Sequence, residues 1–226
     1  MNTSKELPVV RVFNPNTSAT VTTSIAKAIG SVTANLPCCF VFSTARSGPE
    51  GIVTQEDYDF ACGTVANEVT LNQGNHDAFV VACFSDPGVD LVRRSNSDAV
   101  VLGLGECGLR EALTHGERVG IVAIADAAIP RHMRHWERLG LREHVAAERA
   151  LNLPVNQSGS AEIAWEALVS AGRALRDIDG ANTILLGCAG MADLRGPLEE
   201  ELKLPVIDPC AAAAMVAFKR VQRVHT

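Results

Sequence analysis

The chain has 226 residues, of which 47% are hydrophobic and 20% are charged, a balance typical of a globular protein with a sizeable core. Its formal net charge of −6 argues against a nucleic-acid partner, because binding a phosphate backbone requires an excess of basic side chains. No apolar run reaches the roughly 20 residues of a membrane span, and the run 1–6 has no apolar core of signal-peptide length.

Short apolar runs alternate with longer helical patterns along the chain, which is typical of βαβ units with parallel strands. The expected strands, in chain order, are Val9–Phe13, Cys39–Phe42, Ala78–Ala82, Val100–Leu104, Arg118–Ile124, Thr183–Leu186 and Val206–Ile207. The expected helices are Thr17–Thr33, Gln55–Gln73, Gly88–Arg94, Cys107–Thr114, Ile129–Leu139, Ser158–Asp177, Leu194–Leu202 and Ala211–Val224. The run Asn16-Thr-Ser18 can cap the first helix, and Ser158 or Ser160 can cap the long helix that starts at 158.

The order of these elements repeats in the two halves of the chain. In each half, a strand and a long helix precede a second buried strand that ends in a cysteine. We therefore expect an α/β fold of two similar lobes, each a parallel sheet flanked by helices, with the active site in a cleft between them. The expected first lobe comprises residues 1–97 and 206–226, because 204–208 resembles a crossover strand, and the second comprises residues 98–205.

Two cysteines, Cys83 and Cys188, lie at matching places at the carboxyl ends of buried strands. Open α/β sheets bind ligands at this end of their strands. Each loop leads into a helical segment, and a helix N-terminus favours a thiolate and lowers a thiol pKa from about 8.5. Two thiols on opposite sides of one carbon can remove and return its proton, as a cofactor-independent racemase requires. Taken singly, each cysteine also fits an inert, buried role, and that interpretation stays open.

The remaining cysteines lack this context. Seven cysteines in all, without a disulfide-like spacing, indicate free thiols in a reducing cytosol, so we expect a cytoplasmic protein. No spacing suits a metal site. The segment Arg131–Arg138 carries His132 and His135, but two histidines without a third ligand bind metal poorly. We expect a solvated, basic helix face there, with an anion- or partner-binding face as the alternative.

Two loops after strands have more than one interpretation. Asn14 begins the run Asn14-Pro-Asn-Thr-Ser18, which is turn and cap chemistry, yet an amide at a strand end can also face the cleft. The run Gly103-Leu-Gly-Glu-Cys-Gly108 matches the dinucleotide-binding pattern G-x-G-x-x-G between a strand and a helix. Its glycines equally allow a tight turn into the helix. A dinucleotide-dependent oxidoreductase is therefore one alternative function, and a non-catalytic binding protein with the same fold is another.

Four segments resemble the Asp/Glu/hydantoin racemase superfamily and keep its order, with the hydantoin and allantoin racemase branch most similar. They are Phe13-Asn-Pro-Asn-Thr-Ser18, Ala82-Cys-Phe-Ser-Asp-Pro-Gly88, Leu186-Gly-Cys-Ala-Gly-Met191 and Val206-Ile-Asp208. The resemblance implies two pseudo-symmetric α/β lobes and no metal, pyridoxal or nucleotide cofactor. It also implies that Cys83 and Cys188 are the opposing acid–base pair.

The resemblance further predicts which residues hold the substrate. At Ile124-Ala-Asp-Ala-Ala128 the chain departs from a Thr-Thr type sequence that is common in hydantoin racemases, which puts a carboxylate in that wall. The expected substrate-binding residues are Asn14, Pro49, Phe84, Ser85, Asp126, Ala189 and Gly190. The expected function is racemisation or epimerisation of a hydantoin-type or amino-acid-derived carbon acid. Its expected partner is the small-molecule substrate, with no nucleic acid and no membrane, and homo-oligomerisation is left open.

Overall fold

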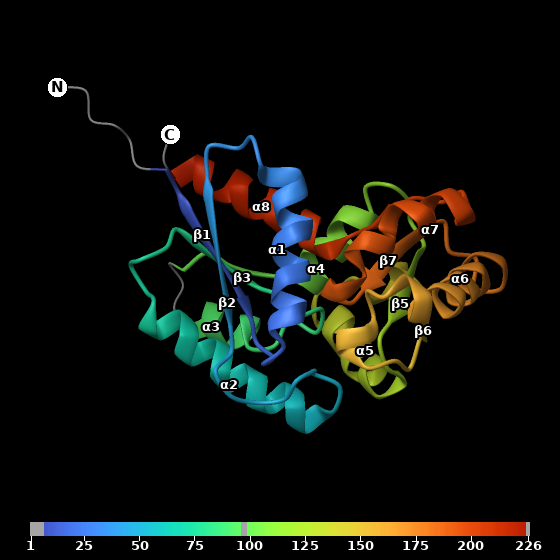
Figure 1. Cartoon of the computed structure of the whole chain (residues 1–226), viewed down its shortest axis with the longest axis horizontal. Helices are drawn as coiled ribbons and strands as arrows, with labels where there is room; N and C mark the ends of the chain where they lie inside the picture. The colour runs from blue at the N-terminus through green and yellow to red at the C-terminus, as the bar shows by residue number, and fades with distance from the viewer. Residues whose placement is uncertain (1–6, 96–98, 225–226) are drawn as a thin grey trace.

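The computed structural model describes residues 7–95 and 99–224 and contains two four-stranded parallel sheets flanked by helices (Figure 1). The α/β fold predicted from the sequence is therefore confirmed. The first sheet consists of β1 (Val9–Asn14), β2 (Cys39–Thr44), β3 (Ala78–Val81) and β4 (Val101–Gly103). The second consists of β5 (Val119–Ala123), β6 (Val145–Ala150), β7 (Thr183–Gly187) and β8 (Val206–Ile207).

Helices connect most of the strands, as the sequence pattern predicts. The α-helices are α1 (Ala19–Thr33), α2 (Gln55–Leu71), α3 (Val89–Ser95), α4 (Leu104–Ala112), α5 (Ile129–Arg138), α6 (Ala161–Asp177), α7 (Arg195–Leu202) and α8 (Pro209–Val224). Short 3-10 helices are η1 (Asp126–Ala128), η2 (Arg142–His144), η3 (Val155–Gln157) and η4 (Ala189–Leu194).

Corresponding strands occupy corresponding places in the two sheets. The strand orders are β2-β1-β3-β4 and β6-β5-β7-β8, so β3 and β7 are both third. The last residue pair in register is Phe13 with Val81 in the first sheet and Ala123 with Gly187 in the second. The chain therefore leaves the two sheets at equivalent edges, just before Cys83 in one and Cys188 in the other.

Strand pairing divides the chain differently from the expected lobes. β4 pairs with β3, so the first sheet extends to Gly103; the expected boundary after residue 97 lies outside the described residues. β8 pairs with β7, which places Val206–Ile207 in the second sheet rather than with the first half. Helix α8, however, packs back against α1 and β3, as expected for a segment that returns to the first half.

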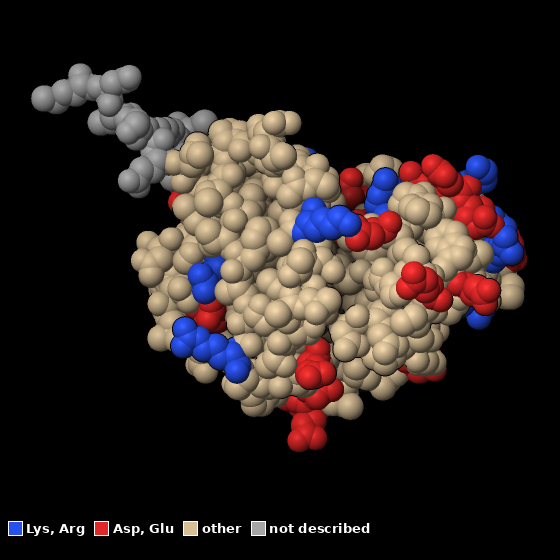
Figure 2. Space-filling model, viewed as in Figure 1, with Lys and Arg blue, Asp and Glu red and all other residues tan. Residues whose placement is uncertain are grey.

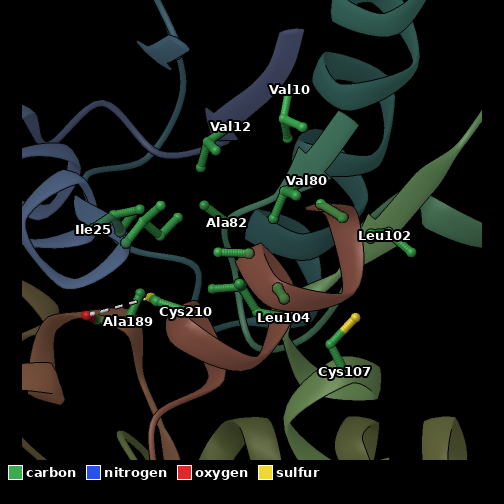
Figure 3. Packing of buried hydrophobic residues seen from close by; sticks show 14 of the residues in the cluster. Val10, Val12, Ile25, Val80, Ala82, Leu102, Leu104, Cys107, Ala189 and Cys210 are labelled. Atoms are coloured by element: carbon green, nitrogen blue, oxygen red, sulfur yellow. Dashed lines mark hydrogen bonds between the residues drawn. The ribbon is translucent and has the colours of Figure 1, made fainter. Parts of the chain in front are cut away.

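Side chains of the first sheet alternate between two packed faces, as strands buried on both sides require. Val10, Val12 and Val80 join the cluster formed with α1 and α8, part of which Figure 3 shows. Phe79 and Val81 join the cluster formed with α2 and α3 on the other face. The prediction that these runs are strands buried on both faces of the sheet is therefore confirmed.

The second sheet is also covered on both faces, and the two halves exchange helices. Val122 and Leu186 pack with α6 and α7, whereas Ile121 and Leu185 pack with α4 and the α5 side. Helix α4 follows the first sheet but covers the second, and α8 follows the second sheet but covers the first. The two exchanged helices also pack on each other, which joins the two halves.

Capping follows the expected chemistry at one helix and departs from it at another. The Ser18 hydroxyl accepts a hydrogen bond from the Val21 backbone N–H at 3.3 Å, which caps α1 as predicted. Ser160 is the N-cap residue of α6, but its side chain makes no capping bond. The Ser158 hydroxyl instead donates to the Val155 carbonyl oxygen at 2.8 Å, so it does not cap the helix either.

The edge strand β6 has no counterpart among the expected strands. Its sequence, Val145-Ala-Ala-Glu-Arg-Ala150, is rich in residues that favour a helix. It pairs only with β5, so sheet pairing overrides local propensity at this position. The strand carries Glu148, whose side chain has no exposed surface.

Neither the helix lengths nor the charges on the visible surface indicate a binding partner. None of the helices within the described ranges is both long and apolar enough to cross a membrane. On the face seen in Figure 2, acidic and basic side chains of the described residues are interspersed and form no continuous basic surface.

Candidate active site

Cys83 and Cys188 line the same pocket. Cys83 lies two residues beyond β3 and Cys188 directly follows β7, so the equivalent ends of the two sheets meet there. Val21 from the first half and Ile124 from the second also form its wall. The cavity between the walls is narrow, about 40 Å³, and the space reaches about 430 Å³ only when the open mouth is included.

The thiol of Cys83 is held mainly in its protonated form. Although the residue is partly exposed, burial raises the pKa of Cys83 to about 12. The backbone N–H of Ser85 and the positive charge of Arg131 lower the pKa of Cys83, but they do not outweigh burial. The expectation that the following helical segment lowers this pKa below the ordinary thiol value is therefore wrong.

Cys188 is buried and has a different set of neighbours. Burial raises its pKa, while the Ser158 hydroxyl and the backbone N–H of Gly190 act in the opposite direction. The Ser158 oxygen lies 3.4 Å from the Cys188 sulfur. A Cβ atom on Gly190 would come within 2.4 Å of that oxygen, so glycine permits the close approach. Each of the two thiols thus has a backbone N–H, of Ser85 or of Gly190, that can stabilise its charged form.

Asn14 forms hydrogen bonds with a residue of the pocket wall but does not itself line the pocket. Its Nδ2 donates to the Asn16 Oδ1 at 2.9 Å, the Ser18 carbonyl oxygen at 3.2 Å and the Thr22 Oγ1 at 3.0 Å. Its Oδ1 accepts from the Asn16 backbone N–H at 3.2 Å. The structure therefore favours the turn interpretation for Asn14, and it is Asn16 that lines the pocket.

The other expected substrate-binding residues divide into two groups. Phe84, Ser85 and Ala189 line the pocket. Gly190, Pro49 and Asp126 do not line it.

Pro49 and Asp126 have other partners. The Pro49 carbonyl oxygen accepts from the Thr17 backbone N–H at 3.0 Å, which holds two loops of the first half together. The Asp126 carboxylate accepts from Asn152 at 2.8 Å on the exposed side of η1, whereas Ala128, at the end of the same turn, reaches the pocket.

One face of α5 is buried, so the expected solvated, basic face is wrong for the histidines and holds only for the exposed Arg134 and Arg138. Arg131, His132 and His135 are buried, and His132 lines the pocket. The His132 Nε2 lies 2.8 Å from the Ser85 hydroxyl oxygen, and its Nδ1 lies 3.1 Å from the Glu148 carboxylate. The sequence gives no direct signal for this cluster, because its carboxylate comes from the unexpected strand β6.

The run Gly103–Gly108 forms the start of α4, where a carboxylate of the chain itself occupies the position of an anion. Asp86 accepts hydrogen bonds from the backbone N–H groups of Gly105 at 2.8 Å and Glu106 at 2.7 Å. A Cβ atom on Gly103 would lie 2.2 Å from the Asp86 side chain. The glycines thus serve close packing, and the amides that a pyrophosphate would need already have a partner.

The other thiols and acidic groups form no metal centre within 7–95 and 99–224, where no cluster of three or more His, Cys, Asp and Glu could hold an ion. Cys107 and Cys210 are buried in the core. The Cys210 sulfur lies 3.9 Å from the Ala189 carbonyl oxygen, as drawn in Figure 3, which packs α8 against the loop that follows Cys188.

The chain matches the family model of the Asp/Glu/hydantoin racemases over residues 10–217. It therefore belongs to the Asp/Glu/hydantoin racemase family, as the four sequence segments predict, and it is an isomerase of the racemase type. Among curated relatives, it is 34% identical over 215 residues to the hydantoin racemase of Paenarthrobacter aurescens, which covers 92% of this chain and 89% of the relative.

Solved structures agree with this family assignment. An allantoin racemase from Klebsiella pneumoniae superposes with a TM-score of 0.85 and 29% identity, covering 96% of this chain and 89% of the other. An allantoin racemase from Pseudomonas fluorescens superposes with a TM-score of 0.88 and 27% identity, covering 96% of this chain and 92% of the other.

Proposed function

We propose that this racemase acts without a cofactor and uses Cys83 and Cys188 as an opposing acid–base pair on a neutral, cyclic carbon acid of the hydantoin type. The observation that carries the proposal is that the two thiols leave equivalent strand ends and line one pocket. A substrate carbon between them would lose its proton to one sulfur and gain a proton from the other, which inverts the centre.

The protonated thiols supply the acid that this chemistry needs, but not the base. Racemisation needs one thiol and one thiolate at any moment, and burial favours the thiol at both positions. The base must therefore form against this preference. Arg131 and the Ser85 amide assist at Cys83, and Ser158 and the Gly190 amide assist at Cys188. Either sulfur can then serve as the base, as a reversible racemase requires.

Within the described residues, the wall of the pocket has no acidic side chain that could pair with a substrate ammonium group. Its polar side chains are those of Asn16, Ser85 and His132, besides the two thiols, and no Lys, Arg, Asp or Glu of the described residues lines it. A free amino acid would need partners for both an ammonium and a carboxylate group. A hydantoin ring has neutral amides, and its ring carbonyl makes the adjacent C–H far more acidic than that of an amino-acid carboxylate. The similar hydantoin and allantoin racemases act on the same substrate class.

The experiment measures racemisation of a panel of chiral substrates by the change in their optical rotation. We expect loss of optical rotation for chiral 5-monosubstituted hydantoins or allantoin and none for aspartate or glutamate. The variants Cys83→Ser and Cys188→Ser should be inactive, while Cys39→Ser, which changes an exposed cysteine outside the pocket, should retain activity. Racemisation of the free amino acids alone would contradict the substrate class. Binding of a hydantoin without racemisation or proton exchange would favour the non-catalytic alternative.

A further inference from the structure

A chain of buried hydrogen bonds leads from the pocket wall to a carboxylate inside the second half. The Ser85 hydroxyl lies 2.8 Å from the His132 Nε2, and the His132 Nδ1 lies 3.1 Å from the Glu148 Oε2. Ser85 and His132 line the pocket, whereas the Glu148 side chain has no exposed surface. The three residues come from the loop after β3, from α5 and from β6, so the fold alone brings them together.

The partners of Glu148 fix the proton on one side of the imidazole ring. The carboxylate accepts from the Trp136 Nε1–H through Oε1 at 3.2 Å, and its Oε2 faces the His132 Nδ1, where an ionised carboxylate accepts a hydrogen bond from the ring. A carboxylate with no exposed surface is stable only beside a compensating charge. Within the described residues, His132 is the side chain whose ion pair with Glu148 the geometry supports. With the Glu148 carboxylate on one side of the ring and the Ser85 oxygen on the other, the geometry points to a hydrogen on each ring nitrogen, Nδ1–H directed at Glu148 and Nε2–H at Ser85.

The Ser85 oxygen then accepts hydrogen bonds from two cations. One comes from the His132 Nε2 at 2.8 Å and the other from the Arg131 Nη2 at 3.2 Å. Arg131 is itself held by the carbonyl oxygens of Val53 and Thr54. With both lone pairs of Ser85 engaged, its single proton is free to donate, and the open side of Ser85 is the pocket.

We propose that His132 and Glu148 are positioning residues that turn the Ser85 hydroxyl proton into the pocket, where it donates a hydrogen bond to the carbonyl oxygen of the bound carbon acid. This inference rests on the proposed function. Removing the proton beside a carbonyl group puts negative charge on that oxygen. A hydroxyl polarised by two cations stabilises this charge more than the neutral carbonyl, so it lowers the barrier to proton removal.

The same three residues in another protonation state would form a nucleophilic serine. If the His132 Nε2 carried no hydrogen, it would accept the Ser85 proton, as in a Ser-His-carboxylate triad. The Arg131 bond to the Ser85 oxygen disfavours that state, because a hydrogen bond received from a cation lowers the nucleophilicity of the oxygen. The two arrangements make opposite predictions for reactivity toward acylating or phosphonylating reagents.

A double-mutant cycle in kcat tests the positioning role. Ser85→Ala should lower kcat for a chiral hydantoin by about a hundredfold to a thousandfold, the usual effect of losing one donor to a developing oxyanion. His132→Phe keeps the ring volume and should also lower kcat. Because His132 acts through Ser85, the double variant should be no slower than Ser85→Ala. Equal losses from His132→Phe in both backgrounds would overturn the proposal.

Two controls keep the cycle interpretable. His135→Phe changes an equally buried histidine of the same helix, which pairs with Asp86 and lies outside the pocket wall, and it should retain most of the wild-type kcat. Thermal unfolding shows which variants fold. If His132→Phe does not fold, the isosteric Glu148→Gln takes its place in the cycle with the same expected outcome.

A spectroscopic measurement separates this inference from the proposed function. In ¹⁵N-histidine spectra at neutral pH, with the signal assigned by its loss in His132→Phe or its shift in Glu148→Gln, we expect both His132 ring nitrogens to carry a hydrogen. An unprotonated Nε2, or His132-dependent labelling of Ser85 by a fluorophosphonate, would overturn the inference whether or not the protein racemises hydantoins. Absence of racemisation together with a doubly protonated His132 would instead refute the proposed function and, with it, the role in stabilising the oxyanion.

Discussion

Alkylation of Cys83 should be slow in the folded protein and should accelerate with pH. A pKa of about 12 instead of 9.0 means a thiolate fraction about a thousandfold smaller near neutral pH. A more basic thiolate is also a better nucleophile, and a Brønsted coefficient of about 0.4–0.5 recovers about 16- to 30-fold of that loss. We therefore expect native Cys83 to react with iodoacetamide about 30- to 60-fold more slowly than the same residue in denatured protein.

The assay is pulse alkylation followed by mass spectrometry of the peptide that contains Cys83, in folded and in denatured protein. Restricted access would also slow the reaction, so the pH profile is the decisive part. Between pH 9 and pH 11 the native rate should keep rising about tenfold per pH unit, while the denatured rate levels off. Native Cys83 that reacts faster than denatured Cys83 at pH 7, or whose rate levels off by pH 9, would refute the reasoning.

Three further predictions concern buried residues outside the pocket wall. Asn14→Ala removes the side chain that makes the bonds to Asn16, Ser18 and Thr22, so it should lower the free energy of unfolding by about 1–3 kcal/mol in urea titrations; unchanged stability with lost turnover would show a direct substrate contact instead. Gly105→Ala would place a Cβ atom 2.2 Å from the Phe84 carbonyl oxygen and should cost about 3 kcal/mol or prevent folding, and a normal melting temperature would contradict this packing. Burial raises the pKa of Cys107 to about 12 from 9.0, so its stabilising contribution is complete below pH 9 and falls by about 1.4 kcal/mol per pH unit above it. The stability of Cys107→Ala should therefore decrease less between pH 10 and pH 11 than that of the wild type, and parallel decreases would refute the assignment.

The sequence predicts the fold and the thiol pair because both follow from local patterns. Buried apolar runs identify β3 and β7, and a cysteine directly beyond such a run must lie at the ligand-binding end of a parallel sheet. The matching order of elements in the two halves then places Cys83 and Cys188 at equivalent positions. The structure adds that both line one pocket, which no local pattern could show.

The polar network beside the thiols depends on contacts that local patterns do not contain. Arg131, His132 and His135 have the composition of an exposed helix face, and they are buried because polar groups from distant segments form hydrogen bonds with them. Glu148 lies on a strand whose residues favour a helix, so neither the strand nor its carboxylate is predictable from propensity. Burial likewise decides the thiol pKa, and burial is a property of the assembled core rather than of the helix that follows.

Asn14 shows a third kind of limit. Its position after β1 and its place in a turn motif fit both a structural and a substrate-binding role. Only the set of hydrogen bonds made by its amide favours the turn, and these bonds join atoms up to eight residues apart.

The most direct test of the two-thiol proposal is enantiomer-specific exchange of the α-proton in D₂O. With the separate enantiomers of a hydantoin, the wild type should exchange the α-proton of both, because each sulfur serves as the base for one hand. Cys83→Ser should lose racemisation in both directions but still exchange the enantiomer whose proton faces Cys188, and Cys188→Ser should show the reverse preference. Racemisation near the wild-type rate in both serine variants would show that the thiols are structural and would contradict the account.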